Sequence, residues 1–239
     1  MKFGLYLSRL AALVLPPACP LCRRTLPLAW EEPFCVACLS GFPPLPEVSC
    51  PRCALPFPSQ VGAPHLCGRC SRKTPPFSAV YAVGLYEENL RRVVQQFKFN
   101  RHIGLDRPLG QLLVRQLPPG HAFDLIIPVP LHPRRLRERS YNQSLLLARE
   151  VGRLLKLPVA ANLLQRTLDT ESQRQFSAIA RERNIRRAFS LPRQLNGEKI
   201  LLIDDVMTTG ATVSACSREL LRGGGEEVQV AVIGRAPIH

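Results

Sequence analysis

The sequence predicts an α/β fold, in which a mainly parallel β-sheet is flanked by helices and is preceded by a small cysteine-rich module. Two observations lead to this prediction. Over the second two-thirds of the chain, continuous apolar runs that suit buried strands alternate with amphipathic segments that suit helices. The first third is instead rich in proline and contains eight of the nine cysteines.

The length and composition are those of a globular protein with room for one sizeable core and a small extra module. The chain has 239 residues, of which 46% are hydrophobic and 21% are charged, so wholesale disorder is excluded. No run of about 18 apolar residues occurs, which excludes a membrane-spanning helix. We therefore divide the chain into three segments, residues 1–15, 16–76 and 77–239.

Residues 1–15 place apolar side chains at helical spacing, which predicts an amphipathic N-terminal helix that packs on the body of the protein. A secretory signal peptide is the competing interpretation. Arg9 interrupts the apolar run, and two prolines stand where a cleavage site before Cys19 would lie. Because a module rich in metal-binding thiols also suits a reducing compartment, we predict a cytoplasmic protein.

Residues 16–76 contain four Cys-x-x-Cys pairs, separated by 12, 11 and 13 residues. Two thiolates from one tight turn fill one edge of a zinc tetrahedron, so this spacing favours zinc over disulfides. Such a segment cannot build a core alone, and the metal would stabilise it. We predict two Cys₄ zinc sites and prefer the pairing of neighbouring pairs, with a cross-braced arrangement as the alternative. The predicted ligands are Cys19, Cys22, Cys35, Cys38, Cys50, Cys53, Cys67 and Cys70.

The remaining segment, residues 77–239, shows the alternation of strands and helices that implies a mainly parallel sheet. Strands are expected at residues 79–83, 123–129, 200–203 and 228–233, and helices at 86–97, 105–116, 143–156, 178–186 and 212–222. The basic segment 132–139 is expected to be a loop. The glycines at 223–225 indicate the end of the last helix.

The positive charge is concentrated in one part of the chain. The net charge is +14, and residues 91–193 alone contain 20 Lys or Arg against 7 Asp or Glu. Most of these basic residues are arginines, whose planar guanidinium suits phosphate. The concentration favours phosphate-bearing partners, either nucleotide-like small molecules or nucleic acid, although many of these side chains would serve as solvated helix faces.

Residues 200–212 form the most informative stretch, because an apolar run is followed by two carboxylates and a threonine-rich turn. The strand would bring Asp204 and Asp205 to the carboxyl edge of the sheet, where open α/β folds bind ligands. The turn and the helix that follows offer N–H groups and hydroxyls to a phosphate, and Gly210 permits close backbone approach. The carboxylates suit ribose hydroxyls and a metal ion. The predicted binding residues are Asp204, Asp205, Val206, Met207, Thr208, Thr209, Gly210, Ala211 and Thr212.

This stretch resembles the phosphoribosyl pyrophosphate (PRPP) loop of type I phosphoribosyltransferases. Together with the cysteine pairs, it makes the chain resemble the ComF family of phosphoribosyltransferase-like proteins, which is linked to DNA uptake in bacterial natural transformation. The resemblance covers nearly the whole chain and extends to residues 129–132, 139–143, 166–173 and 183–189. The family usually has glycine where this chain has Ser140.

The resemblance implies roles for individual residues. Asp204 and Asp205 would contact the ribose hydroxyls as the catalytic acid pair, and the threonine-rich turn would hold the 5′-phosphate. Arg134, Arg135 and Arg139 are candidates for binding the pyrophosphate with Mg²⁺. Residues 166–184 would form a lid over the site, and residues 77–117 a hood that recognises the acceptor.

Three functions are compatible with the sequence. The first is Mg²⁺- and PRPP-dependent phosphoribosyl transfer to an acceptor that the sequence does not identify. The second is a protein that binds PRPP without turnover and holds single-stranded DNA through its basic segment and zinc module. The third is an adaptor that uses the zinc module for protein contacts, for example with DNA-uptake proteins. The intact acid pair and turn favour the first two.

Overall fold

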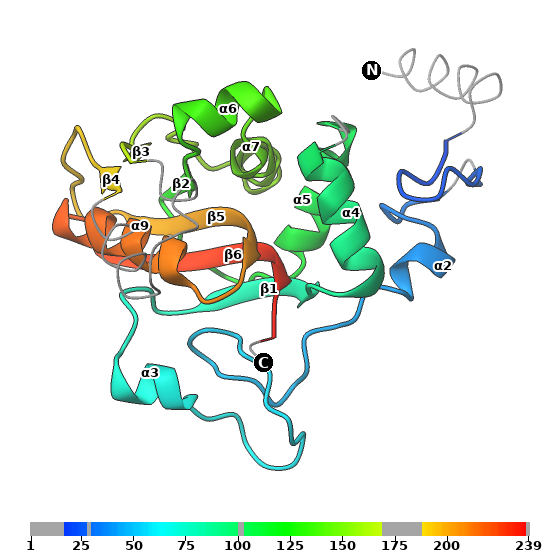
Figure 1. The fold of residues 1–239 in the computed structure, drawn as a ribbon, viewed down its shortest axis with the longest axis horizontal. Helices are drawn as coiled ribbons and strands as arrows, with labels where there is room; N and C mark the ends of the chain where they lie inside the picture. The colour runs from blue at the N-terminus through cyan, green and yellow to red at the C-terminus, as the bar shows by residue number, and fades with distance from the viewer. Residues whose placement is uncertain (1–16, 28–29, 100–102, 169–187, 238–239) are drawn as a thin grey trace.

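The computed structural model describes residues 17–27, 30–99, 103–168 and 188–237, and a four-stranded sheet lies at its centre (Figure 1). The strands are β1 (Val80–Leu85), β2 (Leu125–Pro128), β5 (Lys199–Met207) and β6 (Glu227–Arg235), in the spatial order β1-β6-β5-β2. Each neighbouring pair is parallel. The predicted α/β fold with a parallel sheet is therefore confirmed.

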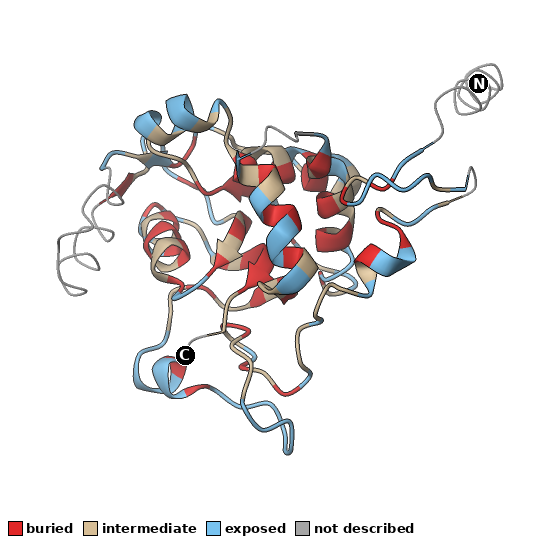
Figure 2. Cartoon of the chain, turned by 45° about the vertical axis from the view of Figure 1, so that its right-hand side comes forward, coloured by how far each residue is buried: buried red, intermediate tan, exposed pale blue. Residues whose placement is uncertain are grey.

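Helices cover both faces of this sheet. Along β5, Leu201 and Ile203 belong to one core, whereas Ile200 and Leu202 belong to the other, because successive side chains of a strand point to opposite faces. The first core is closed by α4 (Glu88–Phe99), α5 (Asp106–Val114) and α7 (Gln143–Leu155), and the second by α9 (Ala211–Arg222). Figure 2 shows the buried residues along the strands and on the inward faces of the helices.

Shorter elements complete the described part of the chain. They are α2 (Val36–Leu39), α3 (Gly68–Arg72), the 3₁₀ turn η1 (Ile103–Leu105), and the antiparallel pair β3 (Gln165–Arg166) and β4 (Phe189–Ser190). The predicted helices at residues 1–15 and 178–186 lie outside the described residues, as does most of the segment expected to form a lid. Across the described ranges, no helix combines the length and apolar character needed to cross a bilayer.

The prediction of a loop at residues 132–139 is wrong, because Pro133–Arg139 form helix α6. Pro133 is at the first helical position, and the His132 side chain accepts a hydrogen bond from the N–H of Arg134. Arg134 also pairs with Glu138 one turn later. The helix buries none of its residues, so it lacks the apolar periodicity by which helices are recognised in a sequence.

All four strands of the sheet differ somewhat from their predicted bounds, and β2 and β5 differ in opposite directions. Strand β2 is shorter than residues 123–129, and β5 runs four residues beyond Ile203. The extension occurs because β6 continues alongside it and pairs Met207 with Arg235. Asp204 and Asp205 therefore belong to the strand itself, where the sheet has narrowed to fewer strands.

The cysteine module packs against the sheet domain at several points. Cys19, Cys35 and Cys38 are part of the core that α4 closes. The last four of the paired cysteines are part of the core beneath α9; they are Cys50, Cys53, Cys67 and Cys70. The backbone also joins the two, because the N–H of Leu85 on β1 donates to the carbonyl of Pro43 at 2.9 Å. The module thus extends both cores of the sheet.

We expect Gly84→Ala to weaken this junction, because a Cβ at Gly84 would lie 2.2 Å from the Pro43 carbonyl oxygen. A forced contact with backbone should reduce the free energy of unfolding by about 1–3 kcal/mol, measured by urea denaturation of the zinc-loaded protein. Gly104→Ala is the matched control, because nothing lies within 4 Å of its Cβ position. Equal stability of the two variants would contradict the prediction.

Candidate functional site

The acid pair lies where the sheet narrows. Strand β2 pairs with β5 only as far as Pro128 opposite Ile203, whereas β5 and β6 stay paired to Met207. Asp204 and Asp205 lie on β5, directly beyond the point where the neighbouring strand β2 ends, at the carboxyl edge of the parallel sheet. This is the edge at which open α/β folds bind ligands.

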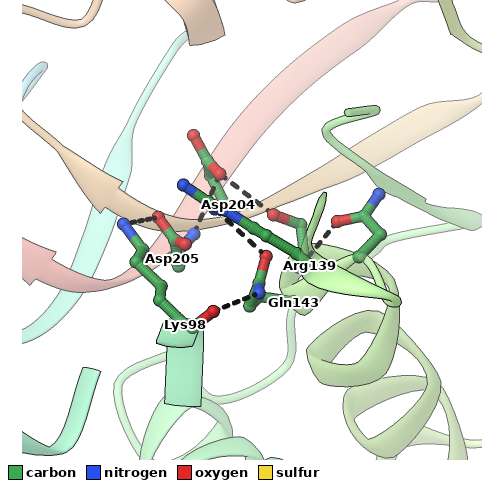
Figure 3. Close-up of polar contacts among 7 residues, drawn as sticks. Lys98, Arg139, Gln143, Asp204 and Asp205 are labelled. Carbon is green, nitrogen blue, oxygen red and sulfur yellow. Dashed lines mark hydrogen bonds and ion pairs between the residues drawn. The ribbon is translucent and has the colours of Figure 1, made fainter. Parts of the chain in front are cut away.

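Two neighbouring helices hold the carboxylates in place, as Figure 3 shows. The hydroxyl of Ser144 on α7 donates to Asp204 Oδ1 at 3.0 Å, and the N–H of Asp205 donates to the same oxygen at 2.9 Å. On α4, Lys98 Nζ lies 2.9 Å from Asp205 Oδ1. The side chains of Lys98 and Asp205 are only 16% and 12% exposed, so this ion pair is largely shielded from water.

The environment changes the acidity of Asp204. Burial and the neighbouring charge of Asp205 raise the pKa of Asp204 from its ordinary 3.8 to about 7, although Lys98 acts in the opposite direction. Near neutral pH the carboxyl is therefore poised between its protonated and ionised forms. A ligand cation, or a hydroxyl that donates to the carboxylate, would favour the ionised form.

Arg139 and Gln143 extend this network. Gln143 is 1% exposed; it accepts a hydrogen bond from Arg139 Nη1 at 3.3 Å and donates to the Lys98 carbonyl at 3.4 Å. The Arg139 guanidinium also lies over the ring of Phe99, 5.3 Å from its centroid. Figure 3 shows Lys98, Arg139 and Gln143 gathered around the acid pair. The site thus combines two carboxylates with two cations.

The other two predicted arginines have different partners. Arg134 and Arg135 both form ion pairs with Glu138 on α6, at 3.2 and 3.6 Å. Arg139 is set apart from them by its place at the last turn of the same helix. The structure therefore brings Arg139 into the network around the acid pair, whereas Arg134 and Arg135 both pair with Glu138.

The turn after α6 positions Ser144. Ser140 ends α6 with φ 67°, a left-handed conformation that favours glycine but is retained here by serine. Asn142 then starts α7 by accepting hydrogen bonds from the N–H groups of Ser144 and Leu145, and its amide donates to the Val129 carbonyl at 3.1 Å. These contacts fix the start of α7 beside the end of β2.

The threonine-rich turn directly follows the acid pair. Val206 is half-buried and Met207 is buried at the end of β5, Thr208 and Thr209 are exposed, and α9 begins at Ala211. Gly210 has φ 78°, a left-handed conformation that favours glycine, and a Cβ there would lie 2.5 Å from Met207 Cε, so a larger residue would also have to displace the end of the Met207 side chain. Thr212 lies half-buried in the first turn of α9. The predicted binding residues are thus placed in sequence along one strand end, one turn and one helix start.

The eight paired cysteines form two groups. Within each group the sulfur atoms lie within 4.8 Å of one another, and every cysteine except Cys22 is buried. The groups are Cys19, Cys22, Cys35 and Cys38, and Cys50, Cys53, Cys67 and Cys70. These are Cys₄ zinc sites by ligand type and number, and the preferred pairing of neighbouring pairs is confirmed.

Backbone N–H groups favour the thiolate form of one cysteine in each group. The N–H of Cys35 donates to Cys19 Sγ at 3.5 Å, and the N–H of Cys67 donates to Cys50 Sγ at 3.4 Å. Burial alone would raise the pKa of Cys19 and Cys50, but such backbone donors lower them from 9.0 to about 6 and about 7. Because the thiolate is the form that binds zinc, the protein fold prepares one ligand in each group for the metal.

Sequence reasoning missed Lys98, Gln143 and Ser144 as parts of the site. Lys98 ends an amphipathic helix and gives no local signal of an acidic partner more than 100 residues away. Gln143 is the last residue of the 139–143 stretch that contributes to the family resemblance, and Ser144 directly follows that stretch. Their contribution depends on how α4 and α7 pack beside the end of β5.

Comparisons with known proteins identify both parts of the chain. Residues 10–74 match the double zinc ribbon domain family, and residues 142–238 match the phosphoribosyl transferase domain family. Among solved structures, glutamine PRPP amidotransferase from B. subtilis is similar, with 18% identity and a TM-score of 0.41 over 57% of this chain and 30% of that one. The two family matches place the protein in the phosphoribosyltransferase-like class, with a double zinc ribbon preceding the phosphoribosyl transferase domain.

Relatives of similar length define the family. Competence protein F of Haemophilus influenzae is 36% identical over 91% of this chain and 96% of its own length, and DNA utilization protein YhgH of Escherichia coli strain K12 has the same identity and coverage. Competence protein ComFC of Streptococcus pneumoniae is 23% identical over 82% of this chain and 84% of its own. The chain belongs to the ComF family.

We expect the purified protein to contain two zinc equivalents, because two complete Cys₄ groups are present. Cys19→Ser and Cys50→Ser should each lose about one equivalent by elemental analysis of protein prepared without chelator. Cys216→Ala is the matched control, since Cys216 is buried in α9 and belongs to neither group. Full zinc content in either serine variant would show that the corresponding group is not a metal site.

The raised pKa of Asp204 predicts a pH dependence of stability. Between its ordinary value of 3.8 and about 7, the folded protein holds a proton on Asp204 that the unfolded chain has released. The contribution of this group to stability should therefore decrease as the pH rises through that window. In thermal melts between about pH 5 and about pH 8, the Tm of wild type should fall relative to that of Asp204→Asn. A difference in Tm that stays constant with pH would contradict this.

Proposed function

We propose that the protein binds PRPP, with Mg²⁺, at the acid pair and the turn that follows it. The observation that carries the proposal is the placement of Asp204, Asp205 and the Thr208–Thr212 stretch at the carboxyl edge of the sheet. Asp204 and Asp205 would accept hydrogen bonds from the ribose hydroxyls. The turn and the first N–H groups of α9 would receive the 5′-phosphate.

The cations beside the acid pair suit the pyrophosphate end of the same ligand. Arg139 and Lys98 approach from α6 and α4 and would share the negative charge of the diphosphate. In the free protein, the Lys98 ammonium already pairs with Asp205, so the carboxylate oxygens are suited to a cation. Asp204 and Asp205 therefore fit Mg²⁺, which would neutralise diphosphate charge when bound.

A complete reaction would transfer the phosphoribosyl group from PRPP to an acceptor. The bond between C1 of the ribose and the pyrophosphate oxygen would break, a bond to the acceptor would form, and pyrophosphate would leave. Arg139 and Lys98 would stabilise the charge on the leaving pyrophosphate. The alternative is that PRPP is sensed without turnover and that the protein acts as an adaptor for DNA-uptake proteins in the cytoplasm.

We further propose that the protein holds single-stranded DNA without sequence preference. The relatives are named as competence and DNA utilization proteins, and the basic surplus of residues 91–193 suits a chain of phosphates. Arg91 and Arg92 are exposed on α4, and Arg137 is exposed on α6. The arginines at 181, 186 and 187, which the sequence also favours for this role, lie outside the described residues.

We expect Asp204→Asn combined with Asp205→Asn to weaken PRPP binding in calorimetric titrations with Mg²⁺. Hydrogen bonds to charged groups contribute roughly 1.5–3 kcal/mol each, so affinity should fall tenfold or much more. Asp124→Asn is the matched control, because Asp124 lies beside Lys199 at the opposite end of β5. Unchanged affinity with unchanged melting would refute the proposed PRPP site. Release of pyrophosphate in the presence of DNA, RNA or free bases would separate turnover from sensing.

For DNA, we expect the logarithm of affinity to fall linearly with the logarithm of salt concentration, by about 0.7 per neutralised phosphate on a single strand. Replacing Arg91 and Arg92 by alanine should flatten the slope measured by fluorescence anisotropy without abolishing PRPP binding. Arg218 and Arg222, exposed on α9 outside the basic segment, provide the matched double-alanine control. No binding at low salt would assign the basic surplus to the phosphate ligand and internal ion pairs.

A further inference from the structure

Arg235, the last residue of β6, is a buried arginine that contacts two functional parts of the molecule at once. Its side chain is among the largest that the fold buries completely, with 1% exposed. Nε donates to the Cys53 carbonyl at 2.9 Å. Nη1 donates to the Thr208 carbonyl at 2.7 Å, to the Met207 carbonyl at 3.2 Å and to the Ala236 carbonyl. One guanidinium thus joins the second cysteine group to the threonine-rich turn.

The charge of Arg235 is matched to a filled zinc site. No carboxylate among the described residues forms an ion pair with it. A zinc ion with four thiolates carries a net charge of about −2, so zinc in the second group would compensate the buried guanidinium.

The contacts of Arg235 also orient the turn. In a trans peptide unit the C=O and N–H groups point in opposite directions. Arg235 holds the Thr208 carbonyl and, together with the Ala236 N–H, the Met207 carbonyl, so the N–H groups of Thr208 and Thr209 point away from the guanidinium. These N–H groups lie in the turn that would receive a phosphate.

Zinc in the second group would fix the other end of this connection. Cys53 supplies a thiol to the group and its own carbonyl to Arg235. The guanidinium is planar and its donors have a fixed spacing. The position of the Cys53 carbonyl and the positions of the Met207 and Thr208 carbonyls therefore depend on each other. The first group, by contrast, belongs to the other core, on the α4 side of the sheet.

We propose that Arg235 is a positioning residue that couples zinc in the Cys50, Cys53, Cys67 and Cys70 group to phosphate binding at the Thr208–Thr212 stretch. The part of this inference that concerns PRPP rests on the proposed function. Coupling between two sites is reciprocal, so PRPP must stabilise this zinc ion to the same degree as the zinc ion favours PRPP. Zinc in the first group provides an internal reference that should not respond.

The experiment measures the equilibrium transfer of zinc from the full-length, two-zinc protein to a chromophoric chelator, with and without saturating PRPP and Mg²⁺. We expect the zinc affinity of one group to rise by at least about fivefold and that of the other to stay unchanged. Serine replacements in the first group identify the group that responds. If calorimetry shows PRPP binding but both zinc affinities are unchanged, the coupling is refuted while the proposed function stands.

A second measurement does not need PRPP. Amide hydrogen exchange at Ala236 of the free protein, whose N–H donates to the Met207 carbonyl that Arg235 also holds, should accelerate about tenfold or more when zinc is removed from the second group, but not when it is removed from the first. This readout also keeps the coupling testable if calorimetry shows no PRPP binding. Exchange at Ala236 that is unaffected by zinc in the second group would overturn the positioning role of Arg235.

Variants then test the guanidinium itself. Arg235→Lys keeps the charge but cannot reach both sets of carbonyls with a planar fork, so the effect of PRPP on zinc affinity should be lost. Arg52→Met is the matched control, because Arg52 lies between Cys50 and Cys53 in the chain but donates to the Phe77 carbonyl. Full coupling in a folded Arg235→Lys protein would refute the role of the bridge. If the lysine variant does not fold, the measurements on wild type decide.

Discussion

The site depends on the unequal lengths of neighbouring parallel strands. Strand β5 is hydrogen-bonded on both sides up to Ile203, and beyond it only β6 continues. Where β2 has ended, the backbone is still fixed by one partner while the other side is open to helices and ligands. The two acidic residues at this point are therefore held by one strand and by the helices beside it.

Helices α4 and α7 surround that opening and set its electrostatics. Lys98 and Ser144 approach the two carboxylates from different helices, and Gln143 connects the Lys98 carbonyl to Arg139. Burial and, after it, the adjacent charge of Asp205 raise the pKa of Asp204, and two carboxylates in such a shielded environment need a cation close by. In the free protein Lys98 supplies that cation. A ligand that binds together with a cation would replace the ion pair that Lys98 forms with Asp205 in the free protein.

The cysteine module is better described as an extension of the two cores than as a separate appendage. Its first group packs on the side of α4 and its second on the side of α9, and buried cysteines contribute to both hydrophobic clusters. The described part of the module has only short helices and isolated bridges, so regular backbone hydrogen bonding contributes little to its stability. Metal binding suits such a segment, because four ligands can organise a short chain that buries little apolar surface. The contact of Arg235 with Cys53 shows how closely this organisation approaches the proposed binding turn.

The sequence by itself determined the α/β class, the zinc ligands and the acid pair with its turn, because each is encoded by residues close together in the chain. Apolar runs define buried strands, four Cys-x-x-Cys pairs define metal ligands, and Asp204 to Thr212 form one continuous stretch. Only the tertiary structure decided that β5 extends to Met207, that α6 is helical, and that Lys98 and Arg235 reach the site from distant segments. These features depend on contacts between distant segments. Strand β2 ends before β5 and β6 do, and the buried guanidinium of Arg235 donates to the Thr208 carbonyl. Such long-range contacts leave no periodic pattern in the sequence.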